Sequence, residues 1–157
     1  MTVKTVVAPL LVLASLCGGP ALAAEKVHAS GTIAVSKYEP ANYDTTAETK
    51  LVLINVEESF AGDLQGAGTA RFLQASRPDG SASFVGMERF VGTVGGKKGS
   101  FILEDVGTLT GDQVNGSWSI VPGSGTGELA GISGDGGFKA KLGQHASITL
   151  DYSFDGR

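Results

Sequence analysis

The sequence predicts an all-β fold in which eight mostly antiparallel strands close into a barrel. Glycine makes up 24 of the 157 residues, and the glycines separate short runs rich in Val, Ile, Thr, Phe and Tyr. No long window has the periodicity of an amphipathic helix. The connections between consecutive runs are short, which is typical of a meander, and closing eight strands removes the exposed sheet edges. A two-sheet sandwich is the alternative architecture.

The first two strands are predicted from their apolar patterns. In residues 26–37, apolar and small side chains alternate with polar ones, as on a half-buried strand. Residues 38–48 are predicted to be a long loop, because they contain Pro40 and Asn42. The second strand, 49–60, contains the continuous apolar run from Leu51 to Ile54, which indicates burial on both faces.

The remaining six strands are set by the turns between them. In the turn Arg77-Pro78-Asp79-Gly80, proline fixes φ at the first corner and glycine takes the left-handed position. Glycines at 95–96, 111 and 143 mark three further turns, and the glycine-rich segment 122–137 is expected to be a loop that closes the barrel. The strands between these turns are predicted at 66–75, 82–92, 99–109, 114–121, 137–142 and 146–154.

The N-terminus has the pattern of a cleavable secretory signal. Lys4 is followed by an uncharged, mostly apolar run, by the breakers Gly18-Gly19-Pro20, and by the small-residue site Ala21-Leu22-Ala23. We therefore predict a signal peptide at 1–23, a single barrel domain at 24–157, and a periplasmic or secreted location. The run is too short to span a membrane, so no membrane span is expected in the mature chain. The only cysteine, Cys17, leaves with the signal, so packing rather than disulfides must stabilise the domain.

Composition and motifs argue against several classes of function. The formal net charge of −4 disfavours a nucleic-acid binder. The segment from Gly125 to Ala130 resembles a dinucleotide fingerprint, but further glycines follow at once and leave no helix to bind a phosphate. A nucleophile elbow is absent, and His28 and His145 lack the spacing of metal ligands. No metal and no cofactor is predicted.

The fourth predicted strand carries the strongest functional signal. Glu88 lies on one apolar face of this strand and Arg89 lies on the other, so one of them must enter an apolar interior. We expect Glu88 to be the interior polar group. Whichever of the two is buried needs a partner such as Arg71, Glu57 or Asp105, and for Glu88 the expected charge partner is Arg89 or Arg71. The aromatic residues predicted to line a ligand there are Trp118, Phe90 and Phe101. Trp118 is also expected to be part of the core.

Several of these segments together resemble one bacterial family, catalogued as domain of unknown function 3224. The resemblance rests on Phe84–Gly92, Gly99-Ser100-Phe101, Trp118–Gly131 with its Pro-Gly-Ser-Gly-Thr-Gly-Glu-Leu run, Leu150-Asp151-Tyr152, Gly62–Gly66 and the turn Arg77–Gly80. It covers nearly all of the predicted mature chain. It implies a barrel similar to that of allene oxide cyclase and the dirigent proteins, and it implies no established reaction.

Three functions follow as hypotheses. The first is an exported barrel that binds a small, largely apolar molecule in its interior, oriented by Glu88. The second is a cyclase or isomerase in which Glu88 or Asp105 has a raised pKa and acts as acid or base. The third is a structural or interaction protein without a ligand, whose apolar outer strands form a homo-oligomer.

Overall fold

The computed structural model describes residues 25–155, so the predicted signal peptide lies outside the described residues. The described chain is all strand and turn. The strands are β1 (Val27–Asp44), β2 (Lys50–Gly62), β3 (Leu64–Ser76), β4 (Ala82–Val94), β5 (Lys97–Thr110), β6 (Gln113–Ile120), β7 (Thr126–Gly127), β8 (Ile132–Lys141) and β9 (Ala146–Phe154). Between residues 25 and 155, no helix is long and apolar enough to cross a membrane.

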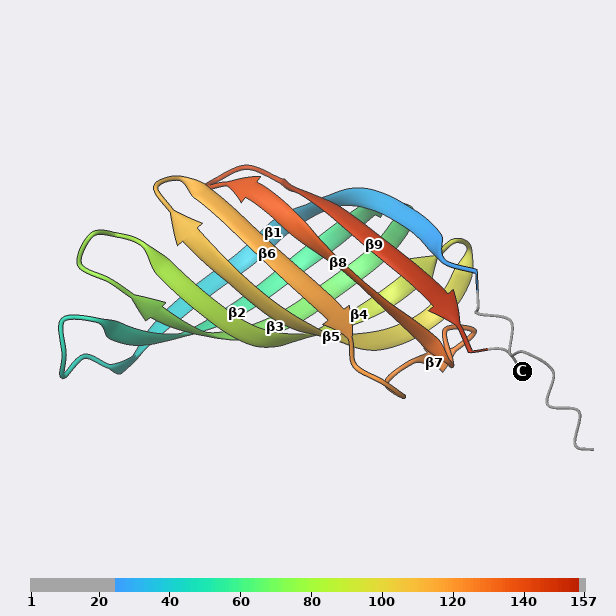
Figure 1. Ribbon diagram of the computed structural model, residues 1–157, viewed down its shortest axis with the longest axis horizontal. Coiled ribbons are helices and arrows are strands. Elements are labelled where there is room, and N and C mark those ends of the chain that lie inside the picture. The colour runs from blue at the N-terminus through green and yellow to red at the C-terminus, as the bar shows by residue number, and fades with distance from the viewer. Residues whose placement is uncertain (1–24, 156–157) are drawn as a thin grey trace, which may run out of the picture.

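Eight of these strands close into an antiparallel barrel (Figure 1). Each strand from β1 to β5 pairs with the next, β6 pairs with β8, β8 pairs with β9, and β9 returns to β1. The two-residue strand β7 adds to the edge of β5 where β6 has ended. The predicted barrel is confirmed, and the sandwich alternative is wrong, because the ring of pairings is complete.

Parts of two predicted loops, 38–48 and 122–137, are instead strand. β1 continues through 38–44, where it pairs with β2 across register shifts at Val35/Lys37 and Asn42/Asp44. Only β2 lies beside this segment, since β9 pairs with residues 27–33, and an edge of this kind tolerates Pro40. β8 begins at Ile132 rather than at 137, because its glycines allow close approach to the neighbouring strands.

The two ends of the barrel differ. One end, here called the plug end, carries the segment 121–131, and Leu129 from this segment is fully buried against the main core. The opposite end, here called the turn end, carries the turns at 45–49, 77–81, 111–112 and 142–145. The inward side chains Phe72, Phe84 and Phe138 near the turn end are only half-buried, so the interior meets solvent there.

Aromatic rings inside the barrel stand over glycines of the adjacent strand. In each case the aromatic residue and the glycine are direct cross-strand partners, and a Cβ added at the glycine would lie 2.2–2.8 Å from the ring. The four pairs are Phe72 with Gly86, Phe84 with Gly107, Phe138 with Gly116, and Trp118 with Gly136. The missing side chains therefore make room for rings to lie flat against the strands and fill the interior.

Candidate functional site

Three acidic side chains point into the barrel and form what we call the interior carboxyl cluster. The cluster consists of Glu58 on β2, Glu88 on β4 and Asp105 on β5. Glu88 is 2% exposed and Asp105 is 0% exposed, while Glu58 is mostly buried. Each acid is in phase with buried apolar residues of its own strand, because alternate side chains of a strand face the same side.

A glycine on the strand between β2 and β4 makes room for the cluster. Gly68 on β3 pairs with Glu58 on one side and with Phe90 on the other. A Cβ added at Gly68 would lie 1.9 Å from Oε1 of Glu88, 2.8 Å from the ring of Phe60 and 3.0 Å from Cγ of Glu58. The carboxyl of Glu88 therefore lies across the bare backbone of β3, toward Glu58.

The described protein offers the cluster no cation and few donors. Oε1 of Glu88 and both carboxyl oxygens of Asp105 accept no hydrogen bond from any described residue. Every Lys, Arg and His between residues 25 and 155 is exposed. Buried polar atoms without a partner cost about 1–3 kcal/mol each, so three of them in one interior are unfavourable for stability.

Burial raises the pKa of all three acids, and neighbouring negative charges add to the rise for Glu88 and Asp105. Burial, with the nearby charges of Glu58 and Asp105, raises the pKa of Glu88 from 4.5 to about 10. Burial, with the charges of Glu58 and Glu104, raises the pKa of Asp105 from 3.8 to about 7. Burial also raises the pKa of Glu58, and its hydrogen bond with Glu88 opposes that rise. Glu88 is thus the protonated partner, and its O–H donates to the Glu58 carboxylate.

The structure places five of the predicted site residues inside, namely Glu88, Asp105, Phe90, Phe101 and Trp118, and two outside. Glu88 faces the interior, as predicted. Phe90 and Phe101 are stacked with ring centroids 4.9 Å apart, and the Trp118 indole donates from Nε1 to the Thr149 carbonyl at 3.1 Å. These aromatic side chains are part of the packed core.

The predicted charge partners are wrong. Arg71 and Arg89 are exposed on the outer face, because they alternate with the inward residues of β3 and β4. Glu57 also lies outside, where it pairs with Lys37 at 3.4 Å. The interior acids therefore face one another rather than a guanidinium.

Sequence reasoning missed Glu58. The signal was available in the alternation of β2, since Glu58 has the same phase as the buried Val56 and Phe60. Asp105 was proposed as a catalytic candidate, and the structure places it beside Glu88: Asp105 pairs with Gly86 and Glu88 pairs with Leu103, so the two acids are diagonal neighbours.

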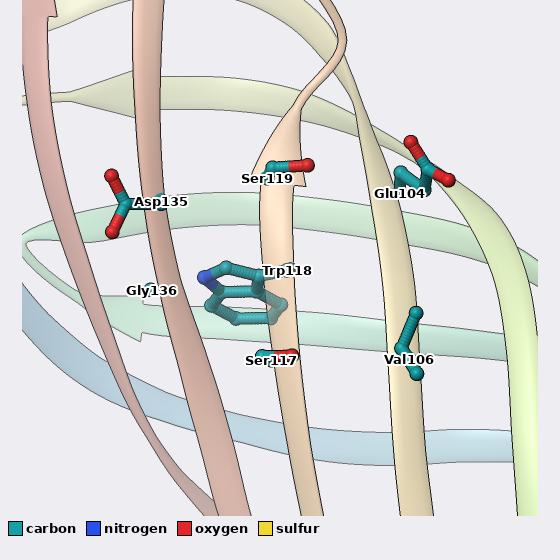
Figure 2. Close-up of a pocket in the computed structure, with 7 residues that line it drawn as sticks. All are labelled: Glu104, Val106, Ser117, Trp118, Ser119, Asp135 and Gly136. Carbon is teal, nitrogen blue, oxygen red and sulfur yellow. The ribbon is translucent and has the colours of Figure 1, made fainter.

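Two hollows lie on the outer surface rather than in the interior. The larger, about 430 Å³, is a trough over β6, where Ser117 and Ser119 lie between Glu104 on β5 and Asp135 on β8 (Figure 2). Figure 2 also shows the Trp118 ring on the opposite side of β6 from these serines, beneath the trough. A smaller hollow of about 180 Å³ lies on β1–β3 and includes Arg71. Neither hollow is lined by the interior carboxyl cluster.

Comparison with known proteins gives the family. Residues 29–152 match the family described as "Protein of unknown function (DUF3224)". The chain belongs to the DUF3224 family. A crystal structure of a DUF3224 protein of unknown function from Shewanella oneidensis MR-1 is similar, with a TM-score of 0.73 and 27% sequence identity over 84% of this chain and 100% of that one. No curated protein matches the chain.

The DUF3224 match covers every strand that contributes to the cluster. Glu58, Glu88 and Asp105 all fall within residues 29–152. Neither the family description nor that of the related crystal structure assigns a function. The chemistry that this site can perform is therefore inferred from its three interior acids.

Proposed function

We propose that this DUF3224 barrel binds a small, largely apolar molecule in its interior, and that the molecule presents hydrogen-bond donors to the carboxyl cluster. The observation that carries the proposal is Asp105, which is completely buried while both of its carboxyl oxygens lack a donor. An unsatisfied buried carboxyl is destabilising, so its presence is best explained by a ligand that satisfies it.

The surroundings of the cluster suit a mostly apolar partner. Trp118 is the cross-strand partner of Asp105, and Phe60 lies beside Glu88 at Gly68. Toward the turn end, Phe84 and Phe138 continue the row of rings, with centroids 6.2 Å apart, and Trp118 lies 5.4 Å from Phe138. A few polar groups in an aromatic interior are typical of small-molecule sites.

Access is proposed from the turn end. Phe72, Phe84 and Phe138 are half-buried there, whereas the plug end is closed by Leu129. These three rings occupy the space between solvent and the cluster, so uptake requires them to turn aside. A ring that stands over a glycine has no Cβ of the neighbouring strand to hinder that rotation.

Binding is tested by titration with the neutral hydrophobic fluorophore N-phenyl-1-naphthylamine. We expect its emission to rise as it enters the interior, and the fluorescence of Trp118, the only tryptophan in the chain, to change over the same concentration range. Asp105→Asn should alter the affinity, whereas Glu57→Gln, an outward-facing change on β2, should not. An unchanged Trp118 signal at saturating probe would contradict interior binding.

A cyclase or isomerase is the second candidate, and one observation favours it. Asp105 has a pKa of about 7 and is poised to exchange a proton near neutral pH, while protonated Glu88 stands beside it as an acid. Under this proposal Glu88→Gln would abolish turnover of a bound substrate and leave its affinity largely unchanged. Equal loss of turnover and affinity would favour binding alone.

The proposal includes export. It is supported by the sequence pattern of residues 1–23, with Lys4, an apolar run and a small-residue site at Ala21-Leu22-Ala23. The mass of the protein purified from the periplasm or culture medium of its own host should correspond to the chain that begins at Ala24. A full-length mass, found only in the cytoplasm, would contradict export.

A further inference from the structure

Resting on the proposed interior site, we propose that the molecule bound there is a primary ammonium with an apolar body. The structure points to this class because the charges, the free acceptors and the ring surface of the interior all match one small cation. A neutral alcohol or an organic acid of the same shape matches only part of this set.

The charge of the interior favours a cation. The inward side chains of the eight barrel strands include three acids, and every basic side chain in the described chain is exposed. Two tyrosines also face inward: Tyr152 is buried at the plug end beside Gly95, and Tyr38, the cross-strand partner of Val56, is exposed. The interior is therefore negative whenever any of the three acids ionises, and that field favours a cation over a neutral molecule and opposes an anion.

The number of free acceptors in the cluster matches the donors of a primary ammonium. Three carboxyl oxygens of the cluster, Oε1 of Glu88 and Oδ1 and Oδ2 of Asp105, have no described donor. A primary ammonium carries three N–H donors and no acceptor. Glu88 and Asp105 are diagonal neighbours on β4 and β5, so one small head group can approach both side chains. A hydroxyl, with one donor, would leave two of these oxygens unsatisfied.

The aromatic surface around the acids also suits an ammonium group. Asp105 lies opposite Trp118, and the ring of Phe84 stands over Gly107, the next inward position of β5. Aromatic faces attract ammonium groups by about 0.5–2 kcal/mol, more when water is excluded. Within residues 25–155, no three His, Cys, Asp or Glu side chains are arranged to hold a metal ion. An organic cation therefore suits the site better than a metal ion does.

Proton uptake by Asp105 should make the affinity of the wild-type protein for an ammonium depend on pH. The charged groups around Asp105 are Glu88 on β4, Glu58 on β2 and the outward Glu104 on β5, while β6 presents Trp118. With a pKa of about 7, Asp105 is ionised above neutral pH and protonated below it. Affinity for an ammonium should thus rise as the pH rises through 7, and affinity for an alcohol should stay nearly constant.

The test compares heptylamine with 1-heptanol as competitors of N-phenyl-1-naphthylamine. At about pH 8 we expect heptylamine to bind about tenfold more tightly than heptanol, and at about pH 5 we expect this advantage to shrink to about twofold or less. Asp105→Asn should remove the advantage of heptylamine over heptanol at about pH 8. Glu57→Gln, with its side chain on the outer face, should keep the advantage.

The outcomes separate this inference from the proposed function. If heptanol binds as tightly as heptylamine at both pH values, the interior takes apolar molecules and the ammonium inference is wrong. If neither competitor nor the fluorophore binds, the proposed function itself fails. The pH comparison needs no variant, so it remains decisive even if Asp105→Asn does not fold.

Discussion

Replacement of Glu88 by glutamine should raise the melting temperature of the protein at about pH 8 by at least about 5 °C and leave it nearly unchanged at about pH 4. Glu88 is protonated in the folded barrel up to a pKa of about 10, whereas in the unfolded chain it ionises near 4.5. Over this interval the unfolded state has lost a proton that the folded state retains. Each such group lowers stability by about 1.4 kcal/mol per pH unit.

The sign of the pH dependence follows from the raised pKa values. A carboxyl group with a higher pKa in the folded protein than in the unfolded chain stabilises the fold fully at pH values below its unfolded-chain pKa. This stability is lost as the pH rises from the unfolded-chain pKa through the folded-state pKa. For Glu88 that interval is 4.5 to about 10, and for Asp105 it is 3.8 to about 7. The wild-type protein should therefore be most stable near pH 4–5 and lose several kcal/mol by about pH 9.

Glutamine should keep the packing of Glu88 while removing this penalty. Its amide N–H can donate to the Glu58 carboxylate as the protonated carboxyl does, and it does not ionise in the unfolded chain. Thermal unfolding followed by circular dichroism across about pH 4–9 gives the comparison, with Glu57→Gln on the outer face as the matched control. A wild-type melting temperature that rises from pH 5 to pH 8 would contradict the argument.

Substitution of Gly68 by alanine should lower the free energy of unfolding by about 3 kcal/mol. The φ angle of Gly68 is not positive, so the backbone accepts alanine without strain. The cost comes from the new methyl group, which would lie 1.9 Å from Oε1 of Glu88 and 2.8 Å from the ring of Phe60. Both neighbours are buried, so neither can move aside without disturbing the core.

A double-mutant cycle identifies the source of that cost. In a Glu88→Ala background the closest clash is gone, so Gly68→Ala should cost at least about 1 kcal/mol less than in the wild type. Denaturant unfolding of the four proteins measures the difference. Ala67→Val, an outward change at the adjacent position of β3, is the control and should change stability by less than about 0.5 kcal/mol. Equal costs of Gly68→Ala in both backgrounds would show that Glu88 does not occupy this space.

The barrel could be predicted from the sequence because its elements are set by local patterns. Strands end at the Pro-Asp-Gly turn 78–80 and at the glycines 95–96 and 111. The glycines of these turns adopt positive φ: Gly80, Gly95, Gly96 and Gly111. The strand over 38–44 could not be predicted this way, because the sequence there contains Pro40. It forms because β2 offers hydrogen-bond partners along its whole length.

The candidate site was predictable only in part. Alternation along β4 indicated that either Glu88 or Arg89 must face the interior, and the structure selects Glu88. The same alternation leaves Arg71 and Arg89 on the outer face. Arg89 or Arg71 was expected to pair with Glu88, but the periodicity of a strand fixes only the face of a side chain and does not show which strands meet across the interior.

The sequence alone determined the class of the fold, the positions of most turns and the presence of an acid on an apolar strand face, because these depend on residues near one another in the chain. Only the tertiary structure decided that Glu58, Glu88 and Asp105 share one interior and that four glycines lie beneath aromatic rings. The physical reason is register: cross-strand partners such as Glu58 with Gly68 and Phe84 with Gly107, which are 10 and 23 positions apart in the chain, are brought into contact by hydrogen-bond ladders that no local pattern specifies.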